Sequence, residues 1–198
     1  MFLKHILRIL FSISLAITVT ACHVVKLDAQ GNPILPVDPK AQLSFDNMSP
    51  SDITNKIWPK LFAEAQTKAI DLNTAMQLNH SDTYHVFVKF DGKVTAYQPT
   101  GLKRLLTVST NVGDIQLNFG PMILSNAIRD ASSIISFDDV KNQVQFARLS
   151  KAINKKAIHN ITIPETSWVN SPIHVVAAVS INNHKILAAI PLIIDRRQ

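Results

Sequence analysis

The strongest constraint on the fold is a set of three segments in which apolar and polar side chains alternate, each with turn residues between its two halves. The dipeptide Asp91-Gly92 favours a type I′ turn, and Asn182-Asn183 marks a second turn of similar kind. Consecutive hairpins pair antiparallel, so the three segments predict one antiparallel sheet of about six strands. The three predicted hairpins span residues 83–98, 102–119 and 173–194.

Helical patterns precede and interrupt these hairpins. Ser49-Pro50 has the form of an N-cap followed by a first-turn proline, and an apolar stripe continues from Ile53 to about Leu78. Pro59 falls inside this stripe and predicts a kink or a restart of the helix. A second helical region at 123–156 lies between the second and third hairpins.

This order of elements predicts an α+β fold. An N-terminal helix is followed by a small antiparallel β-barrel of OB-fold type, with a helical insertion before the last hairpin. The alternative is an open antiparallel α+β sandwich. Pro191 lies within the last apolar run and places that strand at an edge or a bulge.

The N-terminus has the layout of an export signal. Lys4 and Arg8 precede a stretch without charge that ends at Ala21, directly before Cys22. Residues 19–22 (VTAC) resemble a bacterial lipobox, in which the cysteine thiol receives a diacylglycerol group. Cys22 is the single cysteine of the chain, which excludes an internal disulfide framework. We therefore predict a signal peptide over 1–21 and lipidation at Cys22.

The segment 22–48 contains Gly31, Pro33, Pro36 and Pro39 and has no apolar period, so we expect the lipid-bearing cysteine and a flexible tether there. Residues 49–198 then form one globular domain. Loss of 1–21, with its two positive charges and no acid, lowers the net charge from +6 to +4. These features predict a lipid-anchored protein of the bacterial cell envelope that faces the periplasm, and they leave open whether the inner or the outer membrane holds it.

Residues 84–157 carry a resemblance to a known family. The segments 87–89 (FVK), 115–121 (IQLNFGP), 127–131 (AIRDA) and 142–147 (NQVQFA) resemble an uncharacterised family of predicted periplasmic lipoproteins. The genes of that family often lie beside genes for sugar ABC transporters. The resemblance implies an envelope address and possible partners among ABC-transporter components or other envelope proteins, and it implies no reaction. The sequence departs from the family pattern at residues 125–126 and 132–133.

Arg129-Asp130 is the most interesting polar pair. The planar guanidinium of Arg129 is suited to a carboxylate or phosphate, and together with Asp130 it suits sugar hydroxyls. Adjacent residues on a helix point about 100° apart, so the two side chains are not expected to require each other. A structural role, linking helix to barrel, is the alternative and the favoured interpretation.

Other candidates for chemistry are weaker. Asp138-Asp139 favours helix capping over cation binding, since it lacks the alternating oxygen ligands of a calcium loop. No two histidines have helical metal-ligand spacing; His85 and His174 lie on predicted strands and are expected to face solvent. We identify no catalytic motif, no metal site and no cofactor site, and we expect no nucleic-acid binding.

The sequence thus predicts a membrane-anchored periplasmic lipoprotein without catalysis, acting as an accessory or interaction module with a possible link to sugar uptake. Two alternatives stay open. One is a small-ligand protein, for a sugar-like ligand near Arg129 at the barrel mouth. The other is an unrecognised envelope hydrolase.

Overall fold

The computed structural model describes residues 26–27, 33–34, 45 and 47–197. The chain divides into two units, Met1–Gln42 and Leu43–Gln198, and each is described by itself. The predicted signal peptide and Cys22 lie outside the described residues.

In the first unit, β1 (Lys26–Leu27) pairs antiparallel with β2 (Pro33–Ile34). In the second unit, Phe45 is fully buried, and its backbone N–H donates to the carbonyl oxygen of Asp139 at 3.0 Å. The globular unit therefore begins by Phe45, and the end of the predicted tether at residue 48 is corrected, because apolar burial and backbone bonding fix residue 45.

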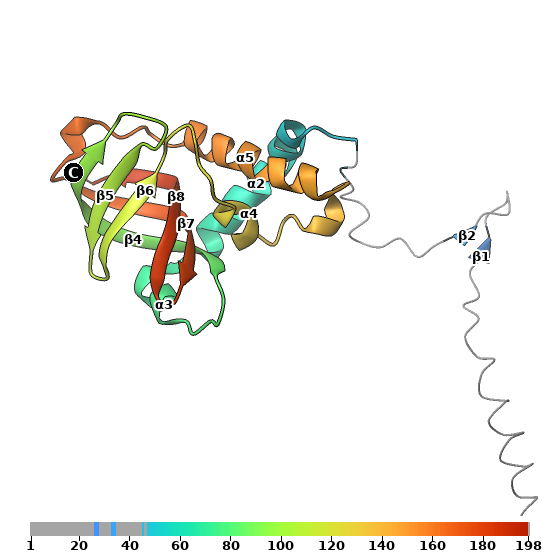
Figure 1. The fold of residues 1–198 in the computed structure, drawn as a ribbon, viewed down its shortest axis with the longest axis horizontal. Helices are drawn as coiled ribbons and strands as arrows, with labels where there is room; N and C mark the ends of the chain where they lie inside the picture. The colour runs from blue at the N-terminus through green and yellow to red at the C-terminus, as the bar shows by residue number, and fades with distance from the viewer. Residues whose placement is uncertain (1–25, 28–32, 35–44, 46, 198) are drawn as a thin grey trace, which may run out of the picture. The chain divides into compact units, whose positions relative to one another are not determined.

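The second unit is built on a curled antiparallel sheet with the strand order β6-β5-β4-β7-β8 (Figure 1). The edge strands β6 and β8 approach each other, so the sheet nearly closes on itself. A short strand β3 (Ile70–Asp71) adds to β4 in parallel. The five main strands are β4 (Tyr84–Gln98), β5 (Leu105–Thr110), β6 (Gly113–Asn118), β7 (Pro172–Asn182) and β8 (Lys185–Arg196).

The hairpin predicted around Asp91-Gly92 is wrong, because this dipeptide lies inside the single strand β4. The first part of β4 pairs with β7 and the last part pairs with β5, so the strand passes between two neighbours. A Cβ atom on Gly92 would lie 2.5 Å from Cγ1 of Val108 and 2.7 Å from the carbonyl oxygen of Ser109. Glycine is thus required here for close approach of two strands rather than for a turn.

The other two predicted hairpins are confirmed. β5 and β6 pair around a turn at Asn111, and β7 and β8 pair around Asn183 and His184. The φ angles of Asn183 and His184 are 47° and 56°, as a type I′ turn demands. Pro191 lies where the β7–β8 register shifts, on a strand at the edge of the sheet order, as predicted.

The first helix, α2 (Pro50–Lys68), begins as predicted, with the Ser49 hydroxyl accepting from the backbone N–H of Asp52. It runs through Pro59 without a restart, and it ends about ten residues before Leu78. The predicted continuation fails because β3 joins the sheet and Asp71 then caps a separate helix, α3 (Leu72–Gln77).

The helical insertion between β6 and β7 is present. It comprises α4 (Ala127–Ala131), the 3-10 turn η3 (Phe137–Asp139), α5 (Gln143–Asn160) and the 3-10 turn η4 (Thr166–Trp168). Helices α2, α4 and α5 lie together beside the barrel (Figure 1). Val144 on α5 is 58% exposed, because α5 buries the face of Leu149 and Ile153.

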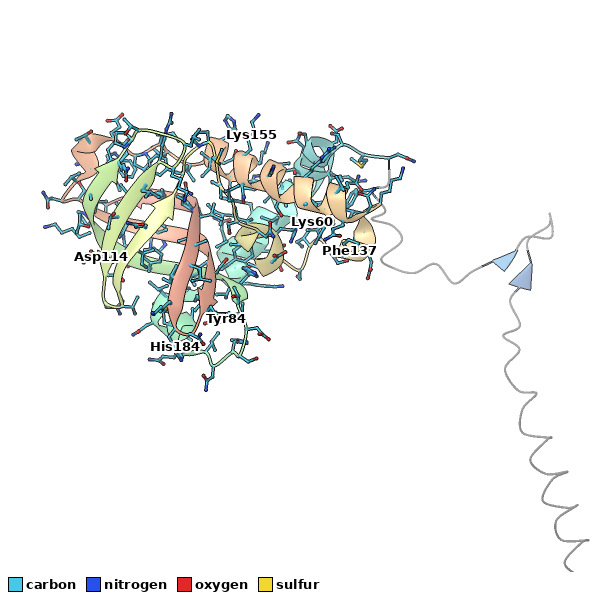
Figure 2. The ribbon with its side chains drawn as sticks, viewed as in Figure 1. Lys60, Tyr84, Asp114, Phe137, Lys155 and His184 are labelled. Carbon is cyan, nitrogen blue, oxygen red and sulfur yellow. The ribbon has the colours of Figure 1, made fainter. Side chains whose placement is uncertain are left out.

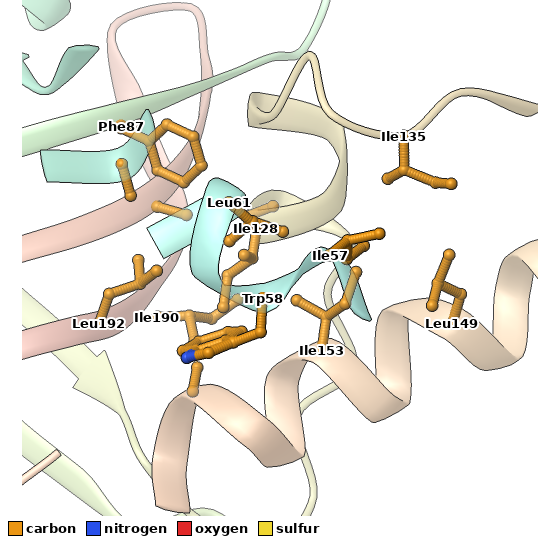
Figure 3. Packing of buried hydrophobic residues seen from close by; sticks show 14 of the residues in the cluster. Ile57, Trp58, Leu61, Phe87, Ile128, Ile135, Leu149, Ile153, Ile190 and Leu192 are labelled. Carbon is orange, nitrogen blue, oxygen red and sulfur yellow. The ribbon is translucent and has the colours of Figure 1, made fainter. Parts of the chain in front are cut away.

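Two apolar cores follow from the alternation of side chains in the sheet. Residues such as Phe87 and Ala178 face the helices, while Val88 and Val179 face the barrel interior. In the helix-side core, Ile57, Trp58 and Leu61 of α2 gather with Ile128, Ile153, Ile190 and Leu192 (Figure 3). The interior of the barrel is filled by side chains such as Leu106, Leu117 and Phe119, so it is a core and not a ligand cavity.

Candidate functional site

Arg129 and Asp130 on α4 pair with each other, against the expectation from their adjacency. The Nε atom of Arg129 lies 2.7 Å from Oδ1 of Asp130. The Arg129 guanidinium also donates to the carbonyl oxygen of Phe146 at 3.0 Å and lies 3.7 Å from the centre of the Phe146 ring. The Arg129 residue is only 7% exposed, so its donors serve α4 and α5 rather than a ligand.

His85 and Ser180 extend this arrangement into the sheet. They face each other across β4 and β7, with 2.9 Å between Nδ1 of His85 and Oγ of Ser180. The other ring nitrogen of His85 lies 3.7 Å from Oδ2 of Asp130. The solvent-facing interpretation of His85 is therefore wrong, while His174 pairs at a different place, with Asp91 at 2.8 Å. The strand register reveals the Ser180 and Asp91 partners, and the packing of α4 against the sheet reveals Asp130.

Ser180, His85 and Asp130 thus contact one another in sequence, as in a catalytic triad, but the arrangement does not suit nucleophilic catalysis. Ser180 lies within β7 and is 5% exposed, whereas a serine nucleophile has to reach a substrate carbonyl. Neither of the two hollows described below is lined by Ser180, His85 or Asp130.

Glu64 holds the segment that follows α4. Its carboxylate accepts from the hydroxyls of Ser132 and Ser133, from the Ser133 backbone N–H at 3.1 Å, and from Lys68 at 2.7 Å. Burial alone would raise the pKa of Glu64, but the hydrogen bonds from Lys68 and the two serines outweigh it and lower the pKa to about 2. Ser132 and Ser133, at which the sequence departs from the family pattern, therefore anchor this carboxylate.

We call this set of bonded polar residues around α4 the α4 network. Its side chains form two bonded groups. Glu64 of α2 bonds to the two serines that follow α4, and Arg129 and Asp130 of α4 link to His85 and Ser180 of the sheet and, through the Phe146 carbonyl, to α5. Its members are Glu64, His85, Arg129, Asp130, Ser132, Ser133 and Ser180.

Asp138 and Asp139 show no cation-binding arrangement. Oδ2 of Asp139 accepts from the backbone N–H and the hydroxyl of Ser136, at 2.7 and 2.8 Å, and so caps η3. Among the described residues, no group of three or more histidine, cysteine, aspartate or glutamate side chains is placed to hold a metal ion.

The larger of two hollows lies on another flank, between the chain after β6 and the second half of α5. It is a groove of about 790 Å³, which we call the cationic groove. Its lining holds four basic side chains, a set of aliphatic side chains and no acid. The lining residues are Arg104, Phe119, Gly120, Pro121, Met122, Ile123, Leu124, Lys151, Asn154, Lys155, Ile158, His159, Ile161 and Ile163.

Backbone contacts fix the sheet-side wall of this groove. The N–H of Phe119 donates to the carbonyl of Arg104 at 3.0 Å, and the N–H of Met122 donates to that of Leu102 at 3.1 Å. A Cβ atom on Gly120 would lie 2.5 Å from the backbone nitrogen of Arg104, so glycine permits this close approach of the two segments. Across the groove, the Asn154 side chain of α5 donates to the carbonyl of Ser125 at 2.8 Å.

Lys151 and Lys155 are exposed, and Lys155 projects from the outer side of α5 (Figure 2), yet both also line the groove. The spacing of Lys151, Lys155 and His159 on one helical face was visible in the sequence. The opposing wall, residues 119–124, was not, since tertiary packing alone brings it there.

A smaller hollow of about 390 Å³ lies at the seam where β6 approaches β8. Its lining mixes Lys103 and Asp114 with apolar residues of β8 such as Leu187. It therefore lacks the uniform positive charge of the cationic groove.

The fold and these sites define a small, nearly closed antiparallel barrel with a helical layer and a positively charged groove. The chain belongs to a family described as predicted periplasmic lipoprotein (DUF2291), whose profile matches residues 12–195. This confirms the resemblance seen in the sequence, and the family is one of unknown function.

A solved structure shares the fold. It is an OB-fold protein from Thermotoga maritima MSB8, with 16% sequence identity and a TM-score of 0.57; the match covers 77% of this chain and 100% of that one. The predicted α+β fold with an OB-type barrel is thus confirmed. No curated protein matches the sequence.

The family description confirms the predicted address, a lipid-anchored protein of the envelope that faces the periplasm. It implies a lipid anchor through a cysteine, and Cys22 stays the predicted attachment residue. Among the helices that the structure describes, none is both long and apolar enough to span a bilayer.

Proposed function

We propose that this lipoprotein is a non-catalytic binding module of the periplasm that uses the cationic groove as its binding site. The observation that carries the proposal is the groove itself, a concavity with several cations and no acid in its lining. A cavity of about 300–1,000 Å³ is the usual size for a small-molecule site. The binding role is a finer form of the accessory function expected from the sequence.

The absence of catalysis in this proposal is supported by the α4 network. Ser180 is buried in β7, and His85 and Asp130 contact neighbouring side chains and line neither of the two hollows. The envelope hydrolase alternative then predicts that His85→Ala abolishes a hydrolytic activity of the purified protein. Our proposal predicts that the natural protein and the His85→Ala variant hydrolyse ester, amide and glycoside substrates at the same background rate.

A sugar-like ligand near Arg129 receives little support. Arg129 is buried and its donors serve Asp130 and Phe146, and apolar side chains fill the barrel interior. We therefore place the ligand site of this proposal in the cationic groove.

The wider role that we propose is accessory to solute uptake, in contact with transporter components or other envelope proteins. Its support is the family resemblance and the periplasmic address, with no contact surface assigned. The test is a strain lacking the gene, complemented with the natural chain, with Cys22→Ala or with Lys151→Gln/Lys155→Gln. We expect altered uptake of labelled solutes, restored only by the natural chain; equal uptake in all strains contradicts the accessory role.

A further inference from the structure

The geometry points to an anionic amphiphile as the ligand of the cationic groove, that is, an aliphatic chain with a carboxylate or phosphate head. This inference rests on the proposed binding function and names the chemistry of the ligand. The head would contact the basic side chains at the rim, and the chain would lie on the aliphatic lining.

The case for an acid head rests on positive side chains of the groove that make no ion pair among the described residues. Lys151, Lys155 and His159 are spaced four residues apart on α5, and Arg104 lies on the other wall. None of the ion pairs among the described residues includes Arg104, Lys151 or Lys155. From residue 140 to residue 164 the sequence has no aspartate or glutamate, so no acid near these cations in the chain neutralises them.

Like charges gathered on one wall repel each other, and an acid ligand relieves that repulsion while it gains charge-assisted hydrogen bonds. A neutral sugar does not relieve this repulsion, because its hydroxyls bring no opposite charge to the lysines. Recognition of sugar hydroxyls commonly uses carboxylates, and the groove lining contains none.

The case for an aliphatic body rests on exposed apolar side chains. Met122, Leu124 and Ile163 are 40%, 76% and 44% exposed, and all three line the groove. The remaining apolar lining is also mainly aliphatic, with Phe119 as the one aromatic side chain in it and itself 1% exposed. Such a surface favours burial of methylene groups over the stacking of a sugar ring or a base.

Asn154 adds a polar position between the cations. Its Oδ1 atom is buried and has no hydrogen-bond donor among the described residues, while its Nδ2 group bonds to Ser125. A buried acceptor without a partner is costly. Because Asn154 lines the groove, a hydroxyl next to the acid head, as on a glycerol phosphate or a hydroxy acid, is the kind of donor that this oxygen lacks.

Two sources supply this chemistry, free acyl acids or lysophospholipids and the anionic lipids of the membrane surface. The shared feature is an acid head on an aliphatic chain. The structure favours a molecule that enters the groove, because the cations border a cavity of about 790 Å³ rather than a flat face.

The test uses the mature chain from residue 22 with Cys22→Ala, so that no attached lipid competes. Isothermal titration calorimetry compares decanoate and decyl phosphate with decanol, which lacks the charge, and with inorganic phosphate, which lacks the chain. We expect the two acids to bind at least about tenfold more tightly than decanol or phosphate.

The double variant Lys151→Gln/Lys155→Gln should weaken the affinity for the two acids about tenfold and leave the affinity for decanol unchanged. Arg148→Gln, an exposed cation on the same helix outside the lining, is the matched control and should change nothing.

Four other outcomes overturn the inference. Equal binding of decanol and decanoate shows that the head is not recognised, and tighter binding of a sugar phosphate than of decyl phosphate shows the wrong ligand class; in both cases a binding function stands.

Vesicles of phosphatidylglycerol and of phosphatidylcholine distinguish the two sources of the ligand, free acids and membrane lipids. If the double variant loses binding to anionic vesicles but keeps its affinity for decanoate, the cations face a bilayer. If no small molecule binds and the groove variants restore uptake fully, the proposed function fails as well.

Discussion

The α4 network and the cationic groove are both rich in polar side chains, but they differ in how those side chains are satisfied. In the α4 network, Arg129 and Glu64 are buried, and hydrogen bonds within the protein occupy them. In the groove, Lys151 and Lys155 are exposed and have no acid partner among the described residues. A buried, saturated group contributes to stability, whereas an exposed, uncompensated group is available for a ligand.

The comparison predicts that removal of Arg129 has the largest effect on stability. Arg129→Ala removes the hydrogen bonds that Arg129 donates to Asp130 and to the Phe146 carbonyl, and it removes a packed side chain. We expect a loss of about 3 kcal/mol in the free energy of unfolding, and a fall in Tm of about 6–12 °C. Chemical denaturation measures the first and calorimetry the second. Arg148→Ala, an exposed control, should change stability little; an unchanged Tm with lost ligand binding would make Arg129 a binding residue.

Glu64 is expected to have the next largest effect, and it depends on pH. The pKa of Glu64 is lowered to about 2 in the fold, so the unfolded chain takes up a proton at higher pH. The stabilisation by its carboxylate is present above about pH 4.5 and is lost as the pH falls toward 2. Glu64→Gln should cost about 2 kcal/mol at neutral pH and flatten the stability profile between these values.

Glu165→Gln is the matched control for that experiment, since Glu165 is exposed. Its pH profile should follow that of the natural chain. A Glu64→Gln profile with the natural slope would show that the carboxylate is not held as the structure indicates.

His85→Ala should have a smaller effect, about 1 kcal/mol, because it leaves the buried hydroxyl of Ser180 without its partner. His174→Ala is the comparison, since its partner Asp91 has a side chain that is 58% exposed and is solvated when the histidine is lost. Denaturation of both variants tests the ranking. Equal losses would indicate that burial of the partner does not decide the cost.

The smallest effect on stability is predicted for the groove. Lys151→Gln/Lys155→Gln should change the free energy of unfolding by less than about 0.5 kcal/mol, because exposed charges without partners add little and repel one another. Thermal denaturation at low and at high salt checks this. A large loss of stability would mean that these lysines belong with the structural residues.

The fold was largely predictable because local patterns agree with it. The hairpins that begin at Leu105 and Pro172 have alternating apolar and polar residues and recognisable turn residues. The helical insertion has apolar residues at helical spacing. Asp91-Gly92 was misread because the sequence shows that glycine is present but not whether a turn or a neighbouring strand requires it. The early end of α2 depended on β3, a pairing across the fold.

The site was less predictable, since its character depends on contacts between distant residues. The structural interpretation favoured for Arg129 agrees with its contacts, but the bond to Asp130 and the links to His85 and Phe146 required the fold. For the groove, α5 alone reads as a solvated basic helix. It becomes one wall of a cavity only when residues 119–124 pack beside it.

The most direct test of this difference is a titration of the isotope-labelled mature chain, with Cys22→Ala, by decyl phosphate, followed by amide chemical shifts. The account predicts shifts concentrated at residues 102–104, 119–125 and 151–163, with the amides of His85, Arg129 and Ser180 unmoved. Shifts concentrated at those three residues, or at barrel-interior residues outside the groove such as Val88 and Leu106, would contradict it.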